Sequence, residues 1–158
     1  MPTLYILCGP SSSGKTTYAQ HFLKEHEEQD IRYVSRDEIR FSLLKDNENY
    51  FAHEKQVFKK FAGTITQTLV DGFDVIADAT HLNIFSRKKL TNAIDKFYTN
   101  YQIVYIIFDI SLQKLLDRNM QRIGLARVPD EVLERMHRDF SPPCNEDKRE
   151  IDRYIVKE

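Results

Sequence analysis

The sequence predicts an α/β fold in which a parallel sheet carries helices on both faces. Short, β-prone apolar runs alternate with segments of helical periodicity along the whole chain, which is typical of βαβ units. The run IVYIIF at 103–108 is unbroken and rich in β-branched residues, which indicates a strand buried on both faces. No linker is long enough to separate two domains, so one domain over 1–158 is expected.

The strands and helices are expected in regular succession. Five runs have the composition of strands: 3–8, 31–35, 74–77, 103–108 and 154–156. Helices are expected at 16–25, 37–44, 50–70 and 111–122, around 90–97, and from Pro129 onward. The segment 50–70 is amphipathic because its apolar side chains recur at every third or fourth position: Phe58, Phe61, Ile65 and Leu69.

Composition places the chain among ordinary globular proteins, with 41% hydrophobic and 30% charged residues. A net charge of -1 excludes recognition of nucleic acid through overall charge, although a local basic groove remains possible. Cys8 and Cys144 lack metal-ligand spacing and make no disulfide framework. No apolar stretch approaches the roughly 20 residues of a membrane helix, and no basic leader precedes the first strand. A cytoplasmic protein without a membrane partner is expected.

The segment GPSSSGKT at 9–16 matches the phosphate-binding P-loop pattern G-x-x-x-x-G-K-[ST]. Its glycines let the backbone turn tightly, so that successive N–H groups converge on phosphate oxygens. A chance match is disfavoured because a strand precedes the motif and a helix follows it. The motif predicts that ATP and Mg²⁺ bind, with Lys15 reaching the β- and γ-phosphates and Thr16 ligating the metal. The expected nucleotide-binding residues are Gly9, Ser12, Ser13, Gly14, Lys15, Thr16 and Thr17.

An acidic residue, Asp78, follows the third predicted strand. A carboxylate at this position suits a residue that helps to hold Mg²⁺ beside the P-loop, or that contacts the acceptor. The alternative is that Asp78 caps the next helix, a role that Thr80 could fill instead.

Asp37 and Arg40 follow the second predicted strand, at the edge of the sheet where ligands bind in parallel folds. Their i, i+3 spacing places them on one helix face. A carboxylate there suits a general base for an attacking hydroxyl, and an arginine suits bidentate binding of an acceptor phosphate. The alternative is that Asp37 caps the helix and that Arg40 is its solvated partner.

Three arginines, Arg118, Arg122 and Arg127, lie in or near 118–140, where a mobile lid over the phosphates is expected. The alternative is a solvated helix face with ordinary ion pairs. The basic run at 87–89 is more typical of a solvated helix face than of a nucleic-acid patch, but Arg87 could still reach the acceptor. For His81 we expect a local role in its loop.

Taken together, these residues resemble the P-loop polynucleotide kinases over nearly the whole chain. The matching pieces are GPSSSGKT, SRDEIR, VIADATHLNIFSRKKL and DRNMQRIGLARVPDEVLERM. The resemblance implies a three-layer fold with strand order 2-3-1-4-5. It also implies that Asp37 is the general base, that Arg40 contacts the acceptor phosphate, and that Arg122 and Arg118 are lid arginines on the donor side. In the phage enzyme of that family, the corresponding acid does not align with Asp78 itself but with the neighbouring position, one residue along the chain.

The expected activity is transfer of the γ-phosphoryl group of ATP to the 5′-hydroxyl end of DNA or RNA. A kinase of a small metabolite or nucleoside would use the same residues for ATP. A nucleotide-binding switch without acceptor chemistry is the alternative from another class, and it would not need a base at Asp37.

Overall fold

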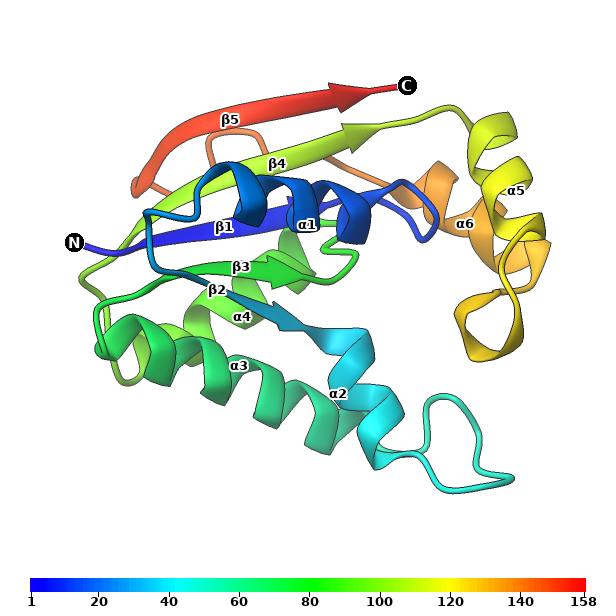
Figure 1. The fold of residues 1–158 in the computed structure, drawn as a ribbon, viewed down its shortest axis with the longest axis horizontal. Coiled ribbons are helices and arrows are strands. Elements are labelled where there is room, and N and C mark those ends of the chain that lie inside the picture. Colours follow the sequence, from blue (N-terminus) through cyan, green and yellow to red (C-terminus); the bar gives the residue numbers. More distant parts are fainter.

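The computed structural model describes residues 1–158 and contains one five-stranded sheet, in which every neighbouring pair of strands is parallel (Figure 1). The strand order β2-β3-β1-β4-β5 confirms the predicted topology. The strands are β1 (Thr3–Cys8), β2 (Ile31–Ser35), β3 (Asp74–Asp78), β4 (Gln102–Asp109) and β5 (Glu150–Lys157).

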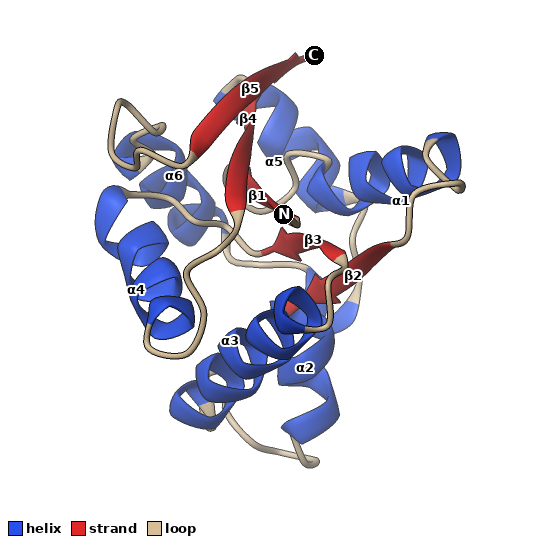
Figure 2. Ribbon diagram, turned by 90° about the vertical axis from the view of Figure 1, so that its left-hand side faces the viewer, coloured by secondary structure: helices blue, strands red, loops and turns tan.

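Helices cover both faces of this sheet, with α1 and α5 on one side and α3 and α4 on the other (Figure 2). The helices are α1 (Lys15–Glu25), α2 (Arg36–Leu43), α3 (Glu54–Val70), α4 (Ile84–Asp95), α5 (Leu112–Met120) and α6 (Asp130–Asp139), with a 3₁₀ turn at Gly124–Ala126. None of these helices combines the length and the apolar character that crossing a bilayer would require.

Three elements differ in extent from the prediction. The helix expected around 90–97 is α4, which begins at Ile84 and ends at Asp95. The helix expected from residue 50 begins at Glu54, because residues 50–53 form a turn, in which Tyr50 and Phe51 line the site described below. The last strand is longer than 154–156 and begins at Glu150. Its charged residues are compatible with a strand because β5 pairs only with β4, which leaves its outer side open to solvent.

The core forms two layers, one on each face of the sheet. Along β1, Leu4, Ile6 and Cys8 face α3 and α4, whereas Leu7 faces α1 and α5. Cys8 is fully buried and belongs to the layer that faces α3 and α4.

The carboxyl ends of β1, β2 and β3 meet at one edge of the sheet, where the P-loop, α2 and the segment after Asp78 begin. The Gly9 N–H donates to the Thr80 carbonyl at 2.9 Å, which joins the P-loop to the end of β3. A Cβ atom at Gly9 would lie 2.8 Å from Phe108 Cβ, so only glycine fits this close approach. Lys15, Asp37 and Asp78 therefore lie at or just beyond the carboxyl ends of three neighbouring strands.

Candidate active site

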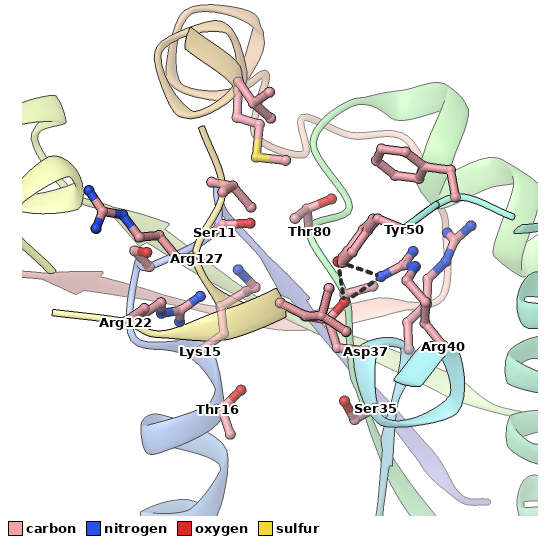
Figure 3. Close-up of a pocket in the computed structure, with 18 of the residues that line it drawn as sticks. Ser11, Lys15, Thr16, Ser35, Asp37, Arg40, Tyr50, Thr80, Arg122 and Arg127 are labelled. Atoms are coloured by element: carbon pink, nitrogen blue, oxygen red, sulfur yellow. Dashed lines mark hydrogen bonds and ion pairs between the residues drawn. The ribbon is translucent and has the colours of Figure 1, made fainter. Parts of the chain in front are cut away.

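A cavity of about 580 Å³ opens at this edge of the sheet, between the P-loop and α2 (Figure 3). Four parts of the chain line it: the P-loop and the start of α1, the segment from 35 to 54, the end of β3, and the predicted lid. The residues predicted from the sequence that the cavity brings together are Ser12, Lys15, Thr16, Asp37, Arg40, Asp78, Arg122 and Arg127.

The P-loop presents a positive, strained surface to this cavity. The Lys15 Nζ donates to the carbonyl oxygens of Gly9 at 2.9 Å and Pro10 at 2.7 Å. Burial lowers the pKa of Lys15 to about 8, while the charges of Asp78 and Asp37 oppose that shift. Ser12 has a φ of 68°, and its buried hydroxyl has no hydrogen-bond partner. A phosphate in the loop would supply an acceptor for both side chains.

Thr16 and Asp78 lie together beneath the P-loop. The Thr16 hydroxyl donates to Asp78 Oδ2 at 2.9 Å, and the Tyr33 hydroxyl donates to the same oxygen. Asp78 is not a helix cap, because α4 begins at Ile84 and its cap is the Asn83 side chain, which accepts from the Ser86 N–H. Thr80 is not the cap either.

These two residues fit a magnesium ion bound partly by substrate. Mg²⁺ is usually held by one or two carboxylates together with phosphate oxygens and water. One carboxylate and one hydroxyl beside the P-loop have that chemistry. The structure contains no group of three or more His, Cys, Asp or Glu side chains that could form an all-protein metal site.

Asp37 is oriented by two neighbours and leaves one oxygen free. Its Oδ1 accepts hydrogen bonds from the Tyr50 hydroxyl, at 2.9 Å, and from Arg40 Nη1 (Figure 3). Its Oδ2 has no hydrogen bond within the protein, and the side chain is 59% exposed toward the cavity. Asp37 does not cap α2, because Ser35 is the N-cap and accepts from the Glu38 N–H.

Arg40 is not free to bind a phosphate in the way the sequence suggested. Its Nε and Nη2 donate to the two carboxylate oxygens of Glu54 at 2.7 and 2.6 Å. Its Nη1 donates to Asp37 and to the Tyr50 hydroxyl. The two nitrogens of Arg40 that could bind a phosphate bidentately are thus occupied by Glu54. This corrects the expectation that Arg40 binds an acceptor phosphate in that way.

The lid arginines lie at different points around the P-loop. A second cavity of about 440 Å³ lies beside α1, lined by Ser13, Gly14, Thr17 and Arg118 among others. The Arg118 Nη1 lies 3.4 Å from the Ser12 carbonyl oxygen. Arg122 lines both cavities, and Arg127 lines only the first. Arg122 therefore stands where the two cavities meet.

Arg87 does not belong to the site, contrary to expectation. Its side chain is 1% exposed and donates from Nε and Nη2 to both carboxylate oxygens of Glu146, each at 2.9 Å. Its Nη1 donates to the His81 carbonyl. Arg87 therefore anchors the segment before β5 to α4 and cannot reach an acceptor. His81 is also buried, and its Nδ1 lies 2.7 Å from the Leu7 carbonyl oxygen, which agrees with a local role.

Sequence reasoning missed four side chains at or beside the cavity: Tyr33, Arg36, Tyr50 and Glu54. Tyr33 lies two residues before Ser35 in β2, so the alternation of the strand puts both on one face and gave a usable signal. Tyr50 and Glu54 gave none, because they were assigned to a helix that was expected to begin at residue 50.

A phosphate-binding loop that faces an oriented carboxylate across one cavity is what phosphoryl transfer to a separate acceptor requires. The fold and this arrangement define a nucleotide-binding P-loop kinase, a transferase. More narrowly, the chain belongs to the AAA_33 family, described as an AAA domain, whose model matches residues 4–143.

The curated relatives include two enzymes that act on nucleic acids by name. The chain is 31% identical over 144 residues to L-seryl-tRNA(Sec) kinase of Methanococcus maripaludis, covering 89% of this chain and 53% of that protein. It is 26% identical over 155 residues to a putative bifunctional polynucleotide kinase/RNA ligase of Autographa californica nuclear polyhedrosis virus, covering 87% and 20%. The chain thus spans about half or less of the length of these relatives.

Solved structures show the same fold. The Pnkp1/Rnl/Hen1 RNA repair complex contains a chain that matches with a TM-score of 0.75 at 23% identity, covering 88% of this chain and 44% of that one. A sugar kinase from Janibacter sp. HTCC2649 matches with a TM-score of 0.70 at 14% identity, covering 99% and 86%. The same fold therefore occurs in a chain of an RNA repair complex and in a sugar kinase.

Proposed function

We propose that this kinase transfers the γ-phosphoryl group of ATP, bound with Mg²⁺, to the 5′-hydroxyl end of a polynucleotide. The observation that carries the proposal is that Lys15 of the P-loop and Asp37 of α2 lie on opposite sides of one cavity (Figure 3). Donor and acceptor groups can meet there in line. The names of the two curated relatives support a hydroxyl carried by nucleic acid.

The residues divide the chemistry between them. The acceptor hydroxyl gives its proton to Asp37 Oδ2 as its oxygen bonds to the γ-phosphorus, and the bond to the β–γ bridging oxygen breaks to release ADP. Lys15 and Arg122 stabilise negative charge on the phosphates. Mg²⁺, when bound, neutralises further charge on the phosphate oxygens, and Thr16 and Asp78 are the residues that would hold it.

A kinase of a small metabolite or nucleoside is the competing proposal, because the fold also occurs in sugar kinases. A switch module without acceptor chemistry is the third. The oriented carboxylate of Asp37 favours the two kinases, because a switch has no need of a base facing the γ-phosphate.

The test supplies the purified chain with Mg²⁺ and ATP labelled at the γ-phosphate, and offers a panel of acceptors. The panel contains a 5′-hydroxyl trinucleotide, the same trinucleotide already phosphorylated at its 5′ end, a seryl-tRNA, a nucleoside and several sugars. The proposal predicts label on the 5′-hydroxyl trinucleotide and none on its 5′-phosphorylated form. Labelling confined to a sugar or a nucleoside would support the metabolite kinase, and hydrolysis of ATP without labelling of any acceptor would support the switch.

A further inference from the structure

A tyrosine hydroxyl of the chain itself contacts the proposed base. Tyr50 lines the cavity from the turn before α3. Its hydroxyl donates to Asp37 Oδ1 at 2.9 Å and accepts from Arg40 Nη1, also at 2.9 Å. The other hydroxyl side chains that line the cavity make no hydrogen bond with Asp37: Ser11, Ser12, Thr16, Ser35 and Thr80. Tyr50 therefore makes, within the chain, the contact that an acceptor hydroxyl would make with the base.

Neighbouring side chains hold the ring of Tyr50 in place. The ring centre lies 4.7 Å from that of Phe51 and 6.1 Å from that of Phe41, both in edge-to-face arrangements. The Arg40 guanidinium lies 4.6 Å from the same ring centre. The hydroxyl is thus presented to Asp37 without the binding of a second molecule. Presentation within one chain removes the entropic cost of bringing an acceptor to the site.

The phosphate-binding loop reaches the same cavity from the other side. In Figure 3 the Lys15 amino group and the Tyr50 hydroxyl point into the cavity, one from the P-loop and the other from the turn before α3. Burial and the charge of Asp37 raise the pKa of Tyr50 to about 12, so its hydroxyl keeps the proton at neutral pH. A hydroxyl in that state needs a base to become a nucleophile, and Asp37 already accepts its hydrogen bond.

We propose that Tyr50 is an internal acceptor, to which the chain transfers the γ-phosphoryl group of ATP when no other acceptor occupies the cavity. The Tyr50 oxygen bonds to the γ-phosphorus, its proton passes to Asp37 Oδ1, and the bond to the β–γ bridging oxygen breaks to release ADP. This inference rests on the donor half of the proposed function and needs no nucleic acid. The phosphate on Tyr50 would place up to about two negative charges beside Asp37, so the modified chain would be a self-inhibited kinase.

The test incubates the full chain with Mg²⁺ and ATP labelled at the γ-phosphate, in the absence of any acceptor. Label on the protein is measured over time, and fragmentation mass spectrometry locates it. We expect one phosphoryl group per chain, on Tyr50, at a rate that does not depend on protein concentration because the transfer is intramolecular. Tyr50→Phe should lose the label, and Tyr5→Phe, which changes a tyrosine of β1 outside the cavity, should keep it.

A second pair of variants tests the role of the base in this reaction. Asp37→Asn should slow the labelling of Tyr50 about 10²–10⁴-fold, the usual contribution of a general base. Glu38→Gln, which changes the neighbouring acid outside the cavity, should leave the labelling rate unchanged. Tyr50→Phe keeps the aromatic ring and its packing, and melting curves check that every variant is folded.

The outcomes separate this inference from the proposed function. Label on Tyr50 supports the internal acceptor even if no polynucleotide is phosphorylated. Absence of label on Tyr50 overturns it even if the 5′-hydroxyl trinucleotide is phosphorylated. Label confined to another residue, a labelling rate that rises with protein concentration, or undiminished labelling in Asp37→Asn also overturns it.

Discussion

Arg40 and Glu54 form a two-bond ion pair, with Arg40 Nε 2.7 Å from Glu54 Oε2 and Arg40 Nη2 2.6 Å from Glu54 Oε1. The Arg40 side chain is only 8% exposed, and its remaining terminal nitrogen reaches Asp37 and the Tyr50 hydroxyl. Glu54 thus fixes Arg40, and Arg40 in turn fixes the carboxylate of Asp37. A helix that begins 14 positions later in the chain therefore holds the proposed base of α2 in place.

The first prediction concerns that pair. Arg40→Gln and Glu54→Gln should each lower kcat about tenfold, the equivalent of about 1.4 kcal/mol, because Asp37 loses its fixed orientation. The acceptor KM should change little. The double variant should be no slower than the slower single variant, because both residues act through Asp37. Arg32→Gln is the control. Arg32 lies near the start of β2, does not line the cavity, and pairs with Asp30. Additive losses, or a raised KM with an unchanged kcat, would show that Arg40 contacts the acceptor itself.

Asp37→Asn should bind ATP normally and lose about 10²–10⁴-fold in rate, the usual contribution of a general base. The substitution is nearly isosteric, and the α2 cap is Ser35, so the melting temperature should not fall through loss of a cap. Single-turnover rates with saturating Mg²⁺ and ATP measure the effect. Glu38→Gln, which changes the neighbouring acid outside the cavity, should keep the full rate. An undiminished rate in Asp37→Asn would exclude Asp37 as the base.

Tyr33→Phe should weaken the use of Mg²⁺ without blocking catalysis. The Tyr33 hydroxyl donates to Asp78 Oδ2, the oxygen that also accepts from Thr16. Loss of such an outer-shell partner typically costs about tenfold or more in metal affinity. The Mg²⁺ concentration for half-maximal rate should rise by that factor, while kcat at saturating Mg²⁺ should be nearly unchanged. Tyr5→Phe, on β1 and away from the cavity, is the control. An unaltered Mg²⁺ dependence would separate Tyr33 from the metal.

Nucleotide binding should take up a proton above about pH 8, because burial lowers the pKa of Lys15 to about 8 in the free chain. The phosphates of ATP are fully ionised there, since the phosphate pKa is about 6, and they would favour the charged form of Lys15. Above that pH Lys15 is mostly neutral in the free chain and would be charged in the complex, so affinity should fall as the pH rises above 8.

Calorimetry at pH 8.5 in two buffers with different ionisation enthalpies measures this proton uptake. Lys15→Ala should remove it, and should also abolish ATP-dependent transfer while leaving the chain folded. Proton uptake that persists in Lys15→Ala, or near-normal turnover in that variant, would contradict the assignment of Lys15 to the donor phosphates.

Arg122→Ala should depress turnover even at saturating acceptor, by up to about 10³-fold if Arg122 acts as an arginine finger. The reason is its position where the two cavities meet, beside the expected place of the γ-phosphate. Arg138→Ala is the matched control, because Arg138 is an exposed arginine of α6 that pairs with Asp139. A change confined to the acceptor KM would show that Arg122 contacts the acceptor and not the donor phosphates.

Much of the fold could be predicted because its signals are local. The P-loop is eight consecutive residues between a strand and a helix, and the amphipathic spacing of α3 is visible within a few turns. The predicted start of α3 was wrong because the residues before it serve the site instead of the core. Residues 50–53 form a turn in which Tyr50 and Phe51 line the cavity, although the apolar pattern that follows favoured an earlier helix start.

The sequence by itself determined the alternation of strands and helices, the phosphate-binding loop and the segment that carries Asp37, because short-range pattern and backbone chemistry specify each of them. Only the tertiary structure decided how the arginines are used. Arg40 pairs with Glu54, 14 positions away in the sequence, and Arg87 pairs with Glu146, 59 positions away. Arg36, in contrast, lines the cavity, and its Nε has no hydrogen-bond partner. The physical reason is that a buried guanidinium needs an acceptor, and which acceptor it meets depends on how distant segments pack against one another.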